Sequence, residues 1–73
     1  MLNLYFQHDS VNKGDLNVVT LLLQSGANIN TPGLENNTPL HEAVINRDSK
    51  MCRLLMQFGA DYKAKNLLGD TPL

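Results

Sequence analysis

The sequence contains few of the features that mark secreted or membrane proteins. Its 73 residues include one cysteine, Cys52. A single cysteine excludes an intramolecular disulfide and fits a reducing compartment. No apolar run approaches the ~18–20 residues of a membrane-spanning helix, and residues 1–7 lack the basic start and cleavage site of a secretory signal. We therefore expect a cytoplasmic or nuclear protein that does not bind membranes.

Charge and catalytic motifs are also sparse. The formal net charge is −1, which provides no field to attract nucleic acid. Glycine-rich phosphate loops, cysteine–histidine zinc spacing and paired carboxylates are missing from the sequence. Cys52 lies in an apolar helical pattern, where we expect a small core residue rather than a nucleophile. The sequence thus predicts no enzyme, no metal site and no cofactor.

What the sequence does contain is a repeat of 33 residues. Residues 8–40 and residues 41–73 are identical at 12 of 33 aligned positions without a gap. A fixed period of this length indicates a protein built from stacked repeats. The identical pairs are His8/His41, Val11/Val44, Asp15/Asp48, Leu21/Leu54, Leu22/Leu55, Gln24/Gln57, Gly26/Gly59, Ala27/Ala60, Leu34/Leu67, Thr38/Thr71, Pro39/Pro72 and Leu40/Leu73.

Each copy predicts a pair of short helices. In the second copy Thr38 is a good N-cap and Pro39 suits the first helical position, so an inner helix should run to about Asn46. An outer helix should begin at Ser49 and end before Gly59, which fits the left-handed position after a helix. The apolar face of the outer helix comprises Met51, Cys52, Leu54, Leu55 and Phe58.

Two turns depart from the pattern. Arg47 stands where the first copy has Gly14, so either Arg47 or Asn46 should adopt a left-handed conformation at a cost of about 1 kcal/mol. In the first loop Asn36 replaces Gly69 of the second, and asparagine tolerates positive φ better than most residues.

The motif Thr38-Pro39-Leu40-His41-Glu42-Ala43, followed by Leu54-Leu55-Met56-Gln57-Phe58-Gly59-Ala60-Asp61, resembles one ankyrin repeat. The resemblance implies an all-α ankyrin-repeat solenoid of stacked helix–turn–helix pairs with β-hairpin loops. It divides the chain into a truncated first repeat (8–37), a second repeat (38–70) and the start of a third (71–73). It also implies that His41 is a structural tie to backbone or to the threonine hydroxyl of a neighbouring turn.

Residues 1–7 do not follow the repeat. Asn3-Leu4-Tyr5-Phe6-Gln7 resembles the recognition site of the tobacco etch virus protease, except that Leu2 replaces its leading glutamate. The alternatives are a translated intron and a genuine terminus. Under each interpretation we expect an unstructured or irregular leader without functional weight.

Ankyrin repeats generally bind proteins or peptides through loop tips and the outward side of the inner helices, and the resemblance implies such a surface here. Leu67 recurs with Leu34, and we expect Leu67 to pack beneath its loop while Leu68 and Ile45 stay available to a partner. The residues mapped to this surface are Asp9, Asn12, Lys13, Leu34, Glu35, Asn37, Glu42, Ile45, Asn46, Lys65, Leu67, Leu68 and Asp70.

Two alternatives accompany this interpretation. Asp9 and Glu42 share one repeat position and could form an acidic ladder beside Glu35 that steers a basic peptide. In line with this, the segments 13–19 and 30–43 are similar to the ankyrin segment of the RING–ankyrin–BRCT family that partners the breast-cancer ubiquitin ligase, which reads a histone tail through acidic residues. Asn37 stands where we would expect another acid. The second alternative is a structural spacer with no partner.

Two further hypotheses concern modification and assembly. Asn30, eight residues after Leu22, resembles the ankyrin asparagine hydroxylated by the factor inhibiting hypoxia-inducible factor, although Asn28 stands where that enzyme prefers an acid. Repeat arrays need capped ends. We expect open apolar ends here, around Leu16, Val19 and Leu22 on one side and Leu55 on the other, and hence possible end-to-end self-association.

Overall fold

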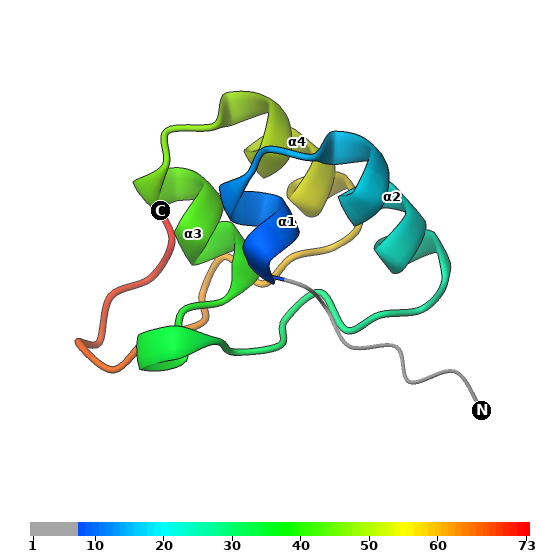
Figure 1. Ribbon diagram of the computed structural model, residues 1–73. Helices are drawn as coiled ribbons and strands as arrows, with labels where there is room; N and C mark the ends of the chain where they lie inside the picture. Colours follow the sequence, from blue (N-terminus) through cyan, green and yellow to red (C-terminus); the bar gives the residue numbers. More distant parts are fainter. Residues whose placement is uncertain (1–7) are drawn as a thin grey trace.

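The computed structural model describes residues 8–73, and within this range the chain forms four α-helices and one short 3₁₀ helix, without a β-strand (Figure 1). The predicted leader, residues 1–7, lies outside the described residues. The helices are α1 (His8–Asn12), α2 (Leu16–Gln24), η1 (Leu34–Asn36), α3 (Pro39–Ile45) and α4 (Ser49–Gln57).

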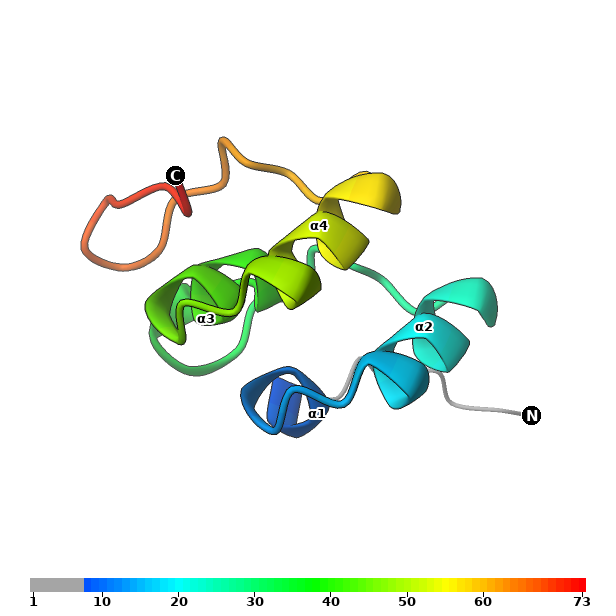
Figure 2. The same ribbon diagram turned by 90° about the horizontal axis from the view of Figure 1, so that it is seen from above.

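The helices are arranged as two stacked pairs. Helix α1 packs against α2 and α3 against α4 within the pairs, while α1 contacts α3 and α2 contacts α4 between them. Figure 2 shows the two pairs as successive layers, with the C-terminal segment beside α3 on the side away from α1. The prediction of an all-α solenoid of stacked helix pairs is confirmed.

Helix α3 begins as its sequence predicts. The Thr38 hydroxyl accepts a hydrogen bond from the His41 backbone N–H (3.3 Å), and the His41 ring in turn accepts one from the Thr38 N–H (3.1 Å). Pro39 occupies the first turn, where a missing N–H leaves no bond unmade. Reciprocal capping of this kind fixes both the start of the helix and the rotamer of His41.

The outer helices use a cap that the sequence pattern did not reveal. Asp15 and Asp48, identical across the repeat, accept hydrogen bonds from the backbone N–H of Val18 (3.2 Å) and Met51 (3.1 Å). Helix α4 begins at Ser49 as predicted, with Asp48 as its N-cap. After the helix, Gly59 adopts a φ of 86°, which confirms its predicted left-handed role.

The turn between α3 and α4 places its strain on arginine. Arg47 has a φ of 55°, whereas Asn46 remains in the right-handed helical region with a φ of −78°. In the first loop Asn36 adopts the predicted positive φ (62°), and Glu35 joins it at 57°. Neither Arg47 nor Glu35 belongs to the residue types that tolerate this conformation well. Backbone hydrogen bonds span both turns, from the Arg47 N–H to the Val44 carbonyl (3.0 Å) and from the Asn37 N–H to the Leu34 carbonyl (3.0 Å).

The loops predicted as β-hairpins turn back on themselves, but they form no strand ladder among residues 8–73. The N–H of Gly33 donates to the Asn37 carbonyl (2.8 Å), and the N–H of Asn66 donates to the Asp70 carbonyl (3.0 Å). Pro32 lacks an N–H and η1 winds the first loop into a helical turn, so the regular pairing of a hairpin does not extend further.

The core lies between the two layers. Val11 and Val19 from the first pair and Met51 and Leu55 from the second are at most 1% exposed. The expectation that Val19 and Leu55 lie on open ends was therefore wrong. Val19 lies on the side of α2 that faces the second pair, and Leu55 lies on the side of α4 that faces the first pair, so both side chains are buried between the layers.

Candidate functional site

Each loop is fastened to an inner helix by a histidine. His41 is buried, and its Nε2 donates a hydrogen bond to the Asp70 carbonyl (2.8 Å) while its Nδ1 accepts one from the Thr38 hydroxyl (2.8 Å). A carbonyl can only accept, so Nε2 carries the proton. In the first repeat, Nε2 of His8 reaches the Thr31 carbonyl (2.8 Å). The structural role predicted for His41 is confirmed.

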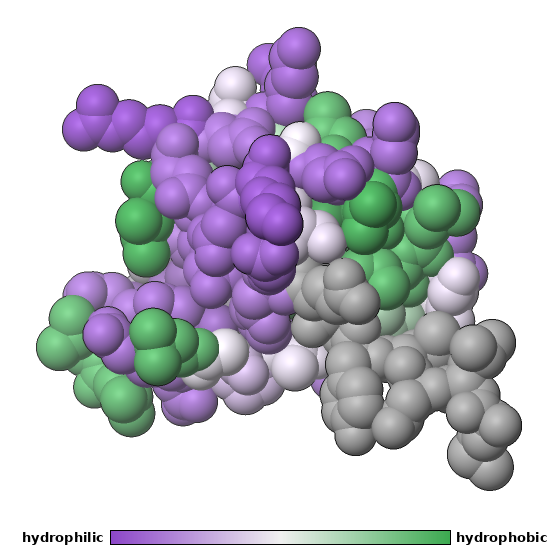
Figure 3. Space-filling view, viewed as in Figure 1, coloured by the Kyte–Doolittle hydropathy of each residue, from purple (hydrophilic) through white to green (hydrophobic). Residues whose placement is uncertain are grey.

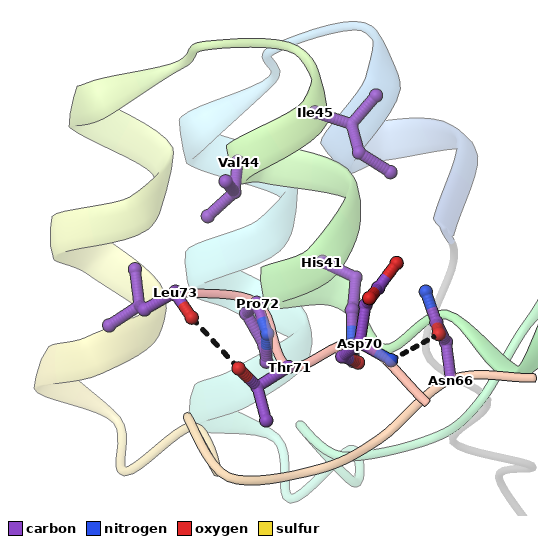
Figure 4. Close-up of a pocket in the computed structure, with 8 residues that line it drawn as sticks. All are labelled: His41, Val44, Ile45, Asn66, Asp70, Thr71, Pro72 and Leu73. Atoms are coloured by element: carbon purple, nitrogen blue, oxygen red, sulfur yellow. Dashed lines mark hydrogen bonds between the residues drawn. The ribbon is translucent and has the colours of Figure 1, made fainter. Parts of the chain in front are cut away.

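Asn66 organises the C-terminal loop. Its Oδ1 accepts hydrogen bonds from the backbone N–H groups of Leu68 (3.0 Å) and Asp70 (2.9 Å), the second of which is drawn in Figure 4. Its Nδ2 donates to Oδ1 of Asn37 (2.9 Å) and so joins the two loops. The sequence reasoning missed this residue, because its register partner Gly33 has no side chain to suggest such a role.

Exposed apolar side chains gather at the loop tips. Leu34 is 81% exposed, Leu67 73% and Leu68 79%, and we call these three the loop-tip leucines. The N–H of Leu67 donates to the Glu35 carbonyl (3.0 Å), so the two loops lie side by side, and Figure 3 shows apolar surface where they project. The expectation that Leu67 packs beneath its loop was wrong, since nothing covers it among the described residues.

The inner helices contribute a mixed surface beside these loops. Ile45, near the end of α3, is 65% exposed as predicted. Asn46 Nδ2 donates to Asn12 Oδ1 (2.9 Å) and ties α3 to α1. The Lys13 ammonium lies 3.1 Å from the Asp9 carboxylate, and both side chains are largely exposed. Asn12, Asn46 and Asn37 thus serve contacts between the repeats, whereas Lys65, Leu68 and Ile45 extend outward.

The acidic residues do not form a uniform ladder. Asp9 is paired with Lys13, and Glu42 is half-buried with its Oε2 shielded from solvent and without a hydrogen-bond partner. Burial raises the pKa of Glu42, partly offset by the nearby His8 and by a hydrogen bond from Asn12. Glu42 therefore holds its negative charge less readily than an exposed glutamate, which weakens its attraction for a basic peptide.

Asn30 makes a contact between repeats. Its side chain is exposed, and its Oδ1 accepts a hydrogen bond from the backbone N–H of Asp61 (2.9 Å). The loop around it is shaped by Asn28, whose Oδ1 accepts from the Asn30 N–H (2.9 Å).

Two hollows open on the side of α3 that faces away from α1. One, of about 330 Å³, lies between α3 and residues 66–73 and is lined by His41, Val44 and Ile45 (Figure 4). The other, of about 410 Å³, is lined by Val44, Arg47, Ser49, Cys52 and Arg53. Burial, reinforced by Asp48, raises the pKa of Cys52, so its thiol is a poor nucleophile at neutral pH.

Residues 8–73 contain no group of three side chains arranged to hold a metal ion. Over the same range, no helix combines the length and apolar character needed to cross a membrane.

Stacked helix pairs, projecting loops and a histidine tie in each repeat define a helical repeat protein. The family model for ankyrin repeats, described as "Ankyrin repeats (3 copies)", matches residues 7–73, and the chain belongs to the ankyrin repeat family. A comparison with curated proteins gave no match. Ankyrin repeats are generally protein–protein interaction modules and are typically not enzymes.

Proposed function

We propose that the chain is a protein-interaction module that holds an apolar segment of a partner protein or peptide against its loop-tip leucines and Ile45. The single observation that carries this proposal is the exposure of the loop-tip leucines on two loops joined by a backbone hydrogen bond. Contiguous exposed apolar surface of this kind marks interaction sites in soluble proteins.

The energetics favour a contact at this surface. Fully burying a leucine side chain contributes about 1.5–3 kcal/mol, so three such side chains supply a useful share of a binding energy. The loops are also pre-organised, because His41 and Asn66 hold the C-terminal loop through hydrogen bonds to its backbone. A fixed loop loses less conformational entropy when a partner binds.

The two alternatives have weaker support. Reading a basic peptide needs several free carboxylates, whereas Asp9 has Lys13 beside it and burial raises the pKa of Glu42. A spacer would not require the loop-tip leucines to face solvent. Both alternatives nevertheless predict distinct outcomes in a binding experiment.

The test is peptide selection followed by quantitative binding. A random peptide library displayed on phage is panned against the whole chain, and fluorescence anisotropy then measures the selected peptides. The comparison variant replaces the loop-tip leucines together (Leu34→Ser, Leu67→Ser, Leu68→Ser). The matched control is Leu21→Ser, which alters an exposed leucine on α2, outside the proposed surface.

Each outcome identifies one of the candidate functions. Apolar peptides whose binding is lost in the triple variant and kept in the control support the proposal. Basic peptides whose binding falls with Asp9→Asn and Glu42→Gln would establish the peptide-reader alternative. Peptide binding that the triple variant leaves unchanged, in a chain that remains helical by circular dichroism, contradicts the loop-tip site, and the absence of any specific peptide supports the spacer.

A further inference from the structure

The two outer faces of the stack differ from their internal counterparts in a systematic way. Val19 and Leu23 of the first repeat are buried against the second repeat, whereas their register partners Cys52 and Met56 are half-buried and 41% exposed. Val44 is likewise more open than its partner Val11. The second repeat therefore presents, uncovered, the face that the first repeat uses to receive its neighbour.

At the other end of the stack, the outer face of the first repeat is more exposed than the equivalent internal face of the second repeat. Met51 and Leu55 are fully buried against the first repeat, while their register partners Val18 and Leu22 in α2 are only half-buried. Figure 3 shows apolar surface over α2 on this side of the molecule. The first repeat thus presents the face that the second repeat inserts into the core.

We propose that the chain associates head to tail with a second copy of itself, the face formed by Val44, Cys52 and Met56 receiving Val18 and Leu22 of the neighbour. The internal junction between the repeats is the template, because the apolar residues that meet there, Val11, Val19 and Leu23 with Met51 and Leu55, have register partners on the two outer faces. The contact is heterologous, so it can continue from copy to copy.

Charge complementarity favours this occupant. A Cβ atom on Gly14 would lie 3.4 Å from Oδ2 of Asp48 in the internal junction. The equivalent pair between copies is Arg47 with Asp15 of the neighbour, so this position would bring together residues of opposite charge. Arg47 lines the larger hollow on the receiving face together with Val44 and Cys52. Opposite charges at such positions fix register and exclude other orientations.

The C-terminal segment is also placed for this contact. Thr71–Leu73 hold the register of Thr38–Leu40, and Pro72 is buried as Pro39 is.

The junction between copies is weaker than the internal one. The internal hydrogen bonds Asn46 to Asn12, Asp61 to Asn30 and Asn66 to Asn37 have no side-chain equivalent between copies. We therefore expect reversible association that depends on protein concentration.

The test is analytical ultracentrifugation of the full chain over a wide concentration range, with reductant present so that a Cys52 disulfide cannot form. The wild-type chain should show a mass that rises with concentration. Met56→Lys disables the receiving face, Leu22→Lys disables the inserting face, and each variant alone should be monomeric. Mixed together they should form one heterodimer and no larger species, because each retains one working face.

Several outcomes overturn the proposal. A wild-type chain that stays monomeric does so directly, as does a Leu22→Lys variant that still dimerises, which would indicate pairing of two receiving faces. If Met56→Lys loses its helical circular dichroism signal, Arg47→Glu replaces it on the receiving face, and at least about a tenfold weakening is expected from the like charges it creates. The loop-tip triple variant should associate normally, so failure here and failure of the proposed binding function are separable.

Discussion

Val19 and Cys52 hold the same position in the two repeats, yet Val19 is fully buried whereas Cys52 is only half-buried. The same contrast separates Leu55 from Leu22 in the opposite direction, although both are leucine. The side chain at one repeat position therefore contributes a different amount to stability, according to whether a neighbouring repeat is stacked on that side. This is the behaviour expected when stability is a sum of repeat and interface contributions.

The comparison of the leucines predicts the largest effect. Leu55→Ala should destabilise the chain by about 2–5 kcal/mol, because it leaves a cavity in the core between the layers. A domain this small is marginally stable, so this variant should be largely unfolded. Leu22→Ala, at the same register, should cost about 1 kcal/mol, because its side chain is already partly in water. Urea titration followed by circular dichroism measures both, and equal costs would contradict the assigned faces.

Replacing the two histidines should give the next largest loss of stability. His41→Ala should cost about 1–3 kcal/mol, since it leaves the buried Thr38 hydroxyl and N–H without their ring acceptor and frees the Asp70 carbonyl. His8→Ala should cost less, because His8 is only half-buried. Thermal unfolding gives the ranking. Amide hydrogen exchange of Leu68 and Asp70 should accelerate in the His41 variant alone, and unchanged exchange would argue against its role as the tie of that loop.

A substitution in the turn between α3 and α4 should stabilise the chain. Arg47→Gly should stabilise the chain by about 1 kcal/mol, because glycine adopts a φ of 55° without the steric cost that arginine bears. Asn46→Gly is the matched control and should give no gain, since Asn46 already has an ordinary φ of −78°. Denaturant midpoints at low protein concentration, where association does not contribute, distinguish the two variants. A gain from the control alone would reassign the strain to Asn46.

Replacing Glu42 should have the smallest effect on stability, and this effect should depend on pH. Burial raises its pKa above the ordinary value of 4.5, so the folded state favours the protonated form. This contribution to stability is full below the ordinary pKa and is lost as pH rises through the raised one. Glu42→Gln should remove that decline and stabilise the chain at neutral pH by less than about 1 kcal/mol, a shift of a few degrees in Tm. Asp9→Asn, at the same register but exposed, is the matched control and should not give this gain in Tm at neutral pH.

Local sequence signals predicted the helices well. Thr38, Pro39 and Gly59 act within one turn of their own position, so their roles follow from backbone chemistry alone. The Asp15 and Asp48 caps follow the same logic, but Ser49 is also a favoured N-cap type, so the local sequence did not distinguish Ser49 from the aspartate before it. The period of 33 residues predicted the stacking of the pairs before any contact was known.

The surface was harder to predict. Leu67 was expected to pack because it recurs with Leu34, yet both are exposed, so recurrence alone does not distinguish a core position from a loop tip. Val19 and Leu55 were assigned to open ends because a helix periodicity shows which residues are apolar but not which neighbour each one faces. The role of Asn66 depends on Asn37 in another repeat, a contact invisible in either segment alone.

The sequence by itself determined the repeat, the helix boundaries of the second copy and the role of His41, since these depend on interactions within a few residues or on a period. Only the tertiary structure decided which apolar positions lie in the core, which lie at the two open ends, and which turn residue bears the strain. Those outcomes depend on whether another layer is packed against a given side chain, and that is a property of the stack rather than of any local stretch of chain.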